Sequence, residues 1–162
     1  MSCSEPAAER RHVAVFGLSA NPPTGAGGHG GVVAAARRAA DEVWVLPVFT
    51  HAFADKAALL APFDARLELC RLGLGDERAS PEHGCPVKVC DTERLVWEAA
   101  RAAQARGVMQ LRARASLTPA CLLLLEQASS DAPPRVGTVD TFNYLEAAHP
   151  DTRFSFVLGA PR

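Results

Sequence analysis

Short apolar runs rich in valine alternate with longer stretches of helical spacing along this chain. The runs cover residues 12–17, 42–49, 86–91 and 154–159. A Gly/Pro-rich loop and an alanine-rich helical pattern follow the first run, and helical patterns separate the others. Strands that alternate with helices pair in parallel through right-handed crossovers. The sequence therefore predicts a three-layer, doubly wound α/β fold, with a parallel sheet, helices on both faces and ligands at the carboxyl ends of the strands.

The length and composition predict one domain. The chain has 162 residues, of which 48% are hydrophobic, enough to bury one core, so we expect a single domain over residues 1–162. Residues 106–135 interrupt the alternation, because they are rich in arginine, then leucine, then serine and proline. This is long for a connection. We interpret it as an irregular inserted segment, and a surface helix with a loop is favoured over a binding arm.

Charge and cysteine content narrow the classes of partner. The 17 basic and 18 acidic residues give a formal net charge of -1, which supplies no long-range field toward nucleic acid or an anionic membrane. The N-terminus has no signal-peptide pattern, and the longest apolar run, ACLLLLE, is far shorter than a membrane span. Five scattered cysteines favour reduced thiols. We expect a soluble, cytoplasmic protein that binds neither nucleic acid nor a membrane.

The loop GLSANPPTGAGGHGG, residues 17–31, lies between the first predicted strand and helix. Such a loop offers backbone N–H groups and the positive end of a helix dipole to an anion, and glycine lets phosphate oxygens approach closely. Gly25, Gly27 and Gly30 formally match G-x-G-x-x-G. That dinucleotide pattern would begin at the strand end and would need an acidic residue after the second strand. A loose linker would not explain His29, so we interpret the segment as a phosphate-binding loop.

This loop resembles the G-x-S-x-N-P-P-(H/T)-x-G-H signature of the nucleotidyltransferase superfamily, and within it the nicotinamide/nicotinate-mononucleotide adenylyltransferases. The resemblance continues in the family's order through VWVLPVFTHAFADKAALLAPFDARLEL, VCDTERL and VGTVDTFNYLEAAHPDTRFSFVLGA. It covers residues 12–100 and 136–160. One departure is the spacer GAGG before the histidine, which is longer than the family's two residues.

A second departure is at the end of the sequence. After Ala160 the family has an aspartate that helps to bind the ATP ribose, a last strand and an I-S-x-T-x-x-R segment that holds the ATP phosphates. Pro161 and Arg162 stand here instead. The resemblance therefore implies a Rossmann-like sheet truncated at the C-terminus, with the last strand of the family fold missing. An unpaired sheet edge would be open to self-association, so a homo-oligomer is one expected outcome.

The resemblance also implies a reaction. In this family the 5′-phosphate of a mononucleotide attacks the α-phosphorus of ATP, with Mg²⁺, and pyrophosphate leaves. This chain would then bind small-molecule nucleotides and serve NAD biosynthesis. The catalytic residues by position are His29 and Lys56, which would neutralise phosphoryl charge. The residues implied to bind phosphate or nucleotide are Gly17, Ser19, Asn21, Thr24, Gly28 and Arg66. Those implied to receive the nicotinate or nicotinamide ring are Trp97, Thr138, Asp140 and Thr141.

Several of these residues also have a structural interpretation. Without the resemblance, Lys56 and Arg66 would be read as solvated charges, Trp97 as a core residue, and Asp140 as a helix cap rather than a base. His83, Cys85 and Cys90 supply three zinc-type ligands but no second pair, so no metal site is predicted.

Two other functions stay open at this stage. One is a catalytically impaired nucleotide-binding or regulatory protein derived from the family. The other is a different nucleotidyltransferase, such as a pantetheine-phosphate adenylyltransferase-like enzyme. A measurement of turnover would distinguish the impaired protein from an active adenylyltransferase. Substrate preference would distinguish the other nucleotidyltransferase from one that uses a nicotinate or nicotinamide mononucleotide. The sequence leaves the choice between nicotinate and nicotinamide open.

Overall fold

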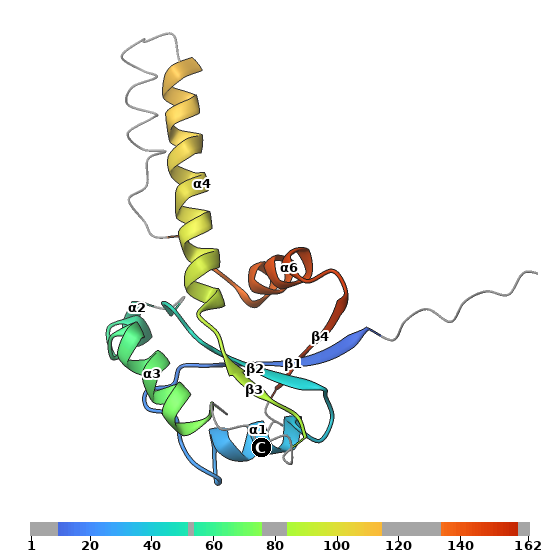
Figure 1. Ribbon diagram of the computed structural model, residues 1–162. Helices are drawn as coiled ribbons and strands as arrows, with labels where there is room; N and C mark the ends of the chain where they lie inside the picture. The colour runs from blue at the N-terminus through green and yellow to red at the C-terminus, as the bar shows by residue number, and fades with distance from the viewer. Residues whose placement is uncertain (1–9, 52–53, 76–83, 115–133, 159–162) are drawn as a thin grey trace, which may run out of the picture.

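A four-stranded sheet forms the centre of the protein (Figure 1). The computed structural model describes residues 10–51, 54–75, 84–114 and 134–158. The strands are β1 (Arg11–Leu18), β2 (Glu42–Pro47), β3 (Val87–Val89) and β4 (Thr152–Phe156). Every pair of neighbouring strands is parallel, and the order in the sheet is β3-β2-β1-β4.

Helices cover both faces of the sheet. They are α1 (His29–Ala36), α2 (Ala54–Ala57), α3 (Phe63–Gly73), α4 (Thr92–Arg114) and α6 (Thr138–Ala148). Figure 1 shows α4 and α6 above the sheet, α1 below it and α3 at its left, and residues of α1 and α3 share one core cluster. This arrangement confirms the predicted three-layer α/β fold with a parallel sheet.

Side chains that alternate along β1 build a core on each face, because successive residues of a strand point to opposite sides. Ala14 and Phe16 pack with α1 and α3, whereas Val13 and Val15 pack with Leu145 of α6. The neighbouring strand β2 alternates in the same way. All four of these β1 residues are buried, with at most 8% exposed. A strand buried on both faces reads as the continuous apolar run seen in the sequence.

The strand order reverses direction at β1. From β1 the chain runs outward through β2 to β3, and it then returns to place β4 on the other side of β1. In open parallel sheets, the crevice at such a switch point, outside the carboxyl ends of the strands, is where ligands bind. We therefore expect a ligand crevice at the carboxyl ends of β1 and β4, near Leu18 and Phe156.

The strand boundaries lie within three residues of the predicted ones, and the ends of two helices differ more. Helix α1 ends at Ala36, earlier than the alanine-rich pattern indicates, because the chain must turn before β2. The Asp41 carboxylate closes this turn by accepting the backbone N–H of His12 at 2.8 Å. Helix α4 continues to Arg114, into the segment interpreted as irregular, because that stretch is rich in strong helix formers. Residues 115–133 of that segment lie outside the described residues.

Among the helices of residues 10–51, 54–75, 84–114 and 134–158, none is both long enough and apolar enough to cross a bilayer.

Candidate functional site

A cavity of 230 Å³ lies at the switch point, between the carboxyl ends of the strands and the first turns of α4 and α6. The strands and their following residues line it with Val15, Gly17, Leu18, Ser19, Leu46, Val48 and Phe156. The helices line it with Glu93, Thr138, Thr141 and Phe142. Mostly apolar walls with a few polar groups are typical of a small-molecule site. Four of the predicted site residues meet here: Gly17, Ser19, Thr138 and Thr141.

The glycine loop holds His29 by contacts with Thr24. The backbone N–H of Thr24 donates to Nδ1 of His29 at 2.9 Å, and the Thr24 hydroxyl oxygen lies 2.9 Å from the same nitrogen. In return, the His29 N–H donates to Thr24 Oγ1 at 3.1 Å. His29 is the first residue of α1, and its ring also packs near Phe16, with centroids 6.1 Å apart. The neutral imidazole therefore keeps its hydrogen on Nε2, where it can donate to an anion.

Two glycines allow the loop to fold back on itself. A Cβ at Gly28 would lie 2.1 Å from Thr24 Oγ1, and one at Gly31 would lie 2.3 Å from the carbonyl oxygen of Ala26. In contrast, a Cβ at Gly25 or Gly27 would meet nothing within 4 Å. Glycine is therefore a packing requirement at Gly28 and Gly31, whereas the backbone at the other two positions is open to an approaching group.

Asn21 fastens the start of the same loop to the segment before α3. Its side-chain Nδ2 donates to the carbonyl of Leu59 at 2.9 Å, and the N–H of Ala61 donates to its Oδ1 at 3.0 Å. Both ends of the amide are thus used within the protein. This residue, predicted to bind phosphate or nucleotide, holds the loop from outside the cavity.

Arg66 lies beneath the loops that follow β1 and β2. Its side chain is buried, with 1% exposed, and it extends from α3. Nη1 donates to the carbonyls of Ser19 and Val48, both at 2.8 Å. Nε donates to Ala61 at 2.8 Å, and Nη2 to Phe49 at 3.3 Å. The structure therefore directs the guanidinium to backbone carbonyls, so Arg66 orients two site loops.

Glu93, in the first turn of α4, is a cavity residue that the sequence reasoning missed. Its Oε2 accepts the backbone N–H of Phe49 at 3.1 Å. Burial raises the pKa of this carboxyl from 4.5 to about 7, against the opposing effects of the Phe49 N–H and of Arg66. The one signal available in the sequence was its place in the first turn of the helix that follows β3, at the carboxyl edge of the sheet. Acidic residues are common in first helical turns for other reasons.

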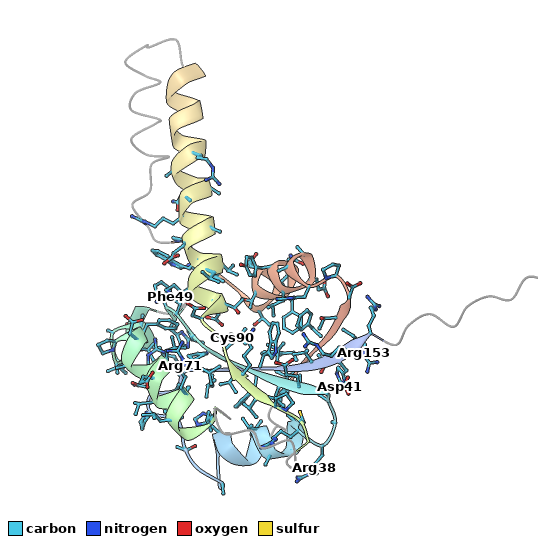
Figure 2. The ribbon with its side chains drawn as sticks, viewed as in Figure 1. Arg38, Asp41, Phe49, Arg71, Cys90 and Arg153 are labelled. Carbon is cyan, nitrogen blue, oxygen red and sulfur yellow. The ribbon has the colours of Figure 1, made fainter. Side chains whose placement is uncertain are left out.

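Trp97 lies one turn beyond Glu93 on α4 and packs against Phe49, with ring centroids 5.3 Å apart. Phe49 in turn contacts Phe63 of α3 at 5.0 Å between centroids. Figure 2 labels Phe49 where α2 and the start of α4 approach each other. The Trp97 Nε1 atom is buried and has no hydrogen-bond partner within the described ranges. Trp97 therefore supports the cavity wall through Phe49 and is not itself among the lining residues.

The start of α6 brings Thr138 and Thr141 to the cavity, and Asp140 stabilises that start. The N–H of Gly137 donates to the Asp140 carboxylate at 2.8 Å, and the Thr141 hydroxyl donates to the Gly137 carbonyl at 3.3 Å. The side chain of Asp140 thus caps the helix. Lys56 is exposed on α2, in the segment that follows β2.

No group of three His, Cys, Asp or Glu side chains is arranged to hold a metal among the residues that the structure describes. Of the cluster considered from the sequence, Cys85 and Cys90 are buried, and His83 lies outside the described residues. Burial raises the pKa of both thiols, that of Cys90 to about 11.

The doubly wound sheet, the glycine loop with His29 at a helix start, and the apolar cavity at the switch point define an α/β protein of the Rossmann-like class, with a crevice at the carboxyl ends of its strands. The chain is 35% identical over 151 residues to two proteins named probable nicotinate-nucleotide adenylyltransferase, from Anaeromyxobacter dehalogenans (strain 2CP-1) and Anaeromyxobacter sp. (strain K). The similarity confirms the resemblance to the adenylyltransferases that the sequence motifs indicate.

The similarity covers nearly all of this chain but only part of each relative. The match covers 93% of this chain and 57% of each relative, so the chain spans a little over half the length of these proteins. No family model matches the chain.

Proposed function

We propose that this chain transfers an adenylyl group from ATP to nicotinate or nicotinamide mononucleotide, which gives a dinucleotide and pyrophosphate. The observation that carries the proposal is the Thr24–His29 contact, which leaves Nε2–H as the free donor at the start of α1. The name of the relatives, probable nicotinate-nucleotide adenylyltransferase, supports this reaction and favours the nicotinate form of the acceptor. The apolar cavity at the switch point supports a site for the acceptor's ring.

The reaction needs positioned positive charge more than a protein nucleophile. An oxygen of the mononucleotide 5′-phosphate attacks the α-phosphorus of ATP, the bond from that phosphorus to the oxygen bridging the β-phosphate breaks, and pyrophosphate leaves with the electron pair. Negative charge spreads over the phosphoryl oxygens during this exchange. His29 Nε2–H, the backbone N–H groups of the loop and the N-terminus of α1 would stabilise that charge.

The cavity would take the ring of the mononucleotide. Phe142 and Phe156 offer apolar faces to a flat ring, and Thr138 and Ser19 offer polar groups at its edge. Trp97 and Asp140 would act on the ring indirectly, because the first packs behind Phe49 and the second caps α6.

ATP would lie on the open side of the glycine loop, where Gly25 and Gly27 leave the backbone accessible. The exposed Lys56 would meet its phosphates as a point charge. We propose that Mg²⁺ arrives with ATP as part of the substrate, because phosphate oxygens are its usual ligands in such reactions. The described residues hold no three-ligand cluster of their own for it.

Pyrophosphate release from ATP and Mg²⁺, with each mononucleotide in turn, tests the proposal. His29→Ala should lower turnover about 100-fold, as expected for loss of one donor to the transition state. His149→Ala is a matched control, because His149 follows α6 at the opposite end of β4. Mononucleotide binding without turnover in the wild type would instead identify a nucleotide-binding protein without the chemistry. Preference for a pantetheine phosphate acceptor would identify a different transferase.

A further inference from the structure

A second cavity, of 580 Å³, lies at the opposite edge of the sheet, where the strands begin. Its charged walls are Arg10, His12, Arg38, Asp41 and Arg153. They come from β1 and the residue before it, from the turn after α1, and from β4. Figure 2 shows Asp41 and Arg153 beside the start of β1 and Arg38 at the end of α1. The reaction proposed above uses none of these residues.

The sheet register brings these side chains together. His12 of β1 is the register partner of Arg153 on β4, so both side chains project from the same face of the sheet. The turn that carries Arg38 is fastened to β1 by two hydrogen bonds. The Asp41 N–H donates to the His12 carbonyl at 2.9 Å, and the His12 N–H donates to the Asp41 carboxylate at 2.8 Å. Three separate segments are thereby fixed around one cavity.

The charges of this cavity are unbalanced. Three guanidinium groups face one carboxylate, and the Asp41 carboxylate already accepts a backbone N–H. Within the ranges that the structure describes, Arg10, Arg38 and Arg153 form no ion pair. Nearby Arg11, in contrast, pairs with Glu42 at 3.1 Å, and Arg94 pairs with Asp64 at 3.2 Å. Counted over the described residues, the cavity therefore carries excess positive charge and guanidinium donors without an acidic partner.

We propose that this cavity is a second binding site, for a small ligand that carries two or more linked phosphates. The planar fork of a guanidinium matches the oxygens of a phosphate, and three such forks around a cavity of 580 Å³ can engage more than one phosphate group. The ring of His12 also lines the cavity, and the hydrogen bond of 2.9 Å between its Nε2 and Ser155 Oγ holds the ring in place. A nucleic acid fits less well, because the chain as a whole has a formal net charge of -1.

The test is titration calorimetry of the full chain with inorganic pyrophosphate. The double variant Arg38→Gln/Arg153→Gln should weaken this binding about tenfold or more, since two charge-assisted contacts are lost. Both side chains are exposed, so the fold should persist, and circular dichroism checks this. Arg10→Gln should weaken the same event by less. Arg71→Gln, at an exposed arginine of α3 that pairs with Glu68, is the matched control and should leave it unchanged.

The glycine loop also offers an anion site, so His29→Ala separates the two. The binding event assigned to the arginine cavity should survive in His29→Ala and be lost in the double variant. Pyrophosphate affinity that is unchanged in the double variant would overturn the proposal, as would an event abolished by His29→Ala alone. A short single-stranded oligonucleotide that bound more tightly than pyrophosphate through Arg38 and Arg153 would also overturn it.

Discussion

The backbone N–H of Thr24 donates to Nδ1 of His29, and this bond determines which nitrogen of the ring carries the hydrogen. A backbone N–H can act only as a donor, so Nδ1 must present a lone pair. The remaining nitrogen, Nε2, then carries the hydrogen in the neutral ring. The loop has thus fixed the tautomer of its histidine before any ligand arrives, which lowers the cost of organising the site around an anion.

Nitrogen-15 NMR of the ring measures this tautomer directly. At a pH where His29 is neutral, we expect the chemical shifts and couplings of the Nε2–H form. Thr24→Val should preserve that pattern, because the backbone N–H remains. The variant should lower the free energy of unfolding by about 1 kcal/mol, since the hydroxyl that accepts the His29 N–H is lost. Resonances of the Nδ1–H form would contradict the arrangement.

Glycine substitutions at two positions of the loop should behave differently. Gly28→Ala should lower the free energy of unfolding by about 1–2 kcal/mol, because its Cβ displaces Thr24 Oγ1 from His29. Gly25→Ala should change it by less than about 0.5 kcal/mol, because nothing lies within 4 Å of that Cβ. Urea unfolding of both variants makes the comparison, and equal losses of stability would show that close packing at Gly28 is not what requires glycine.

Replacing Arg66 should destabilise the protein more than a change in charge alone would. Arg66→Lys keeps the charge but cannot serve the carbonyls of Ser19, Val48 and Ala61 together, because an ammonium lacks the planar fork. We expect a loss of about 3 kcal/mol in the free energy of unfolding, from the buried carbonyls left without donors. Arg71→Lys on the same helix is the control, and its exposed side chain should make the change near zero. Similar small losses in both would contradict the role assigned to Arg66.

The stability of the protein should depend on pH through Glu93. Its pKa is raised from 4.5 to about 7 on folding, so the unfolded chain releases this proton first as the pH rises. The favourable contribution is fully present below pH 4.5 and is lost as the pH rises through about 7.

Glu93→Gln keeps an oxygen for the Phe49 N–H but carries no charge. The variant should therefore be more stable than the wild type above that range, by an amount on the order of 2 kcal/mol. Urea unfolding across this pH range measures the effect. Glu98→Gln, on the exposed side of the same helix, is the control and should leave the pH dependence as it is in the wild type. A wild-type slope that persisted in Glu93→Gln would assign the effect to another group.

The sequence predicted the parallel sheet and the position of the glycine loop between β1 and α1, because both depend on local pattern. The valine-rich runs and the glycines that precede His29 can be recognised in the sequence without knowing what packs against them. For Arg66 and Glu93, the local pattern does not predict the role, because that role depends on contacts between distant segments. The residue type tells the charge of Arg66, but only the fold shows that its side chain is buried and donates to carbonyls of two loops. In the sequence, Glu93 is an ordinary acidic residue in the first turn of a helix. Only the fold shows that it lines a cavity together with residues of β1 and β4.

The cavity at the switch point is formed by the earliest and the latest strands described. Val15 belongs to β1 and Phe156 to β4, and the strands pair with these two residues in register. A chain emerging from the ribosome can assemble β1, β2 and β3 in order, but it has no complete cavity until β4 is added. Acceptance of a ligand there would report that synthesis has passed β4 and that β4 has paired with β1.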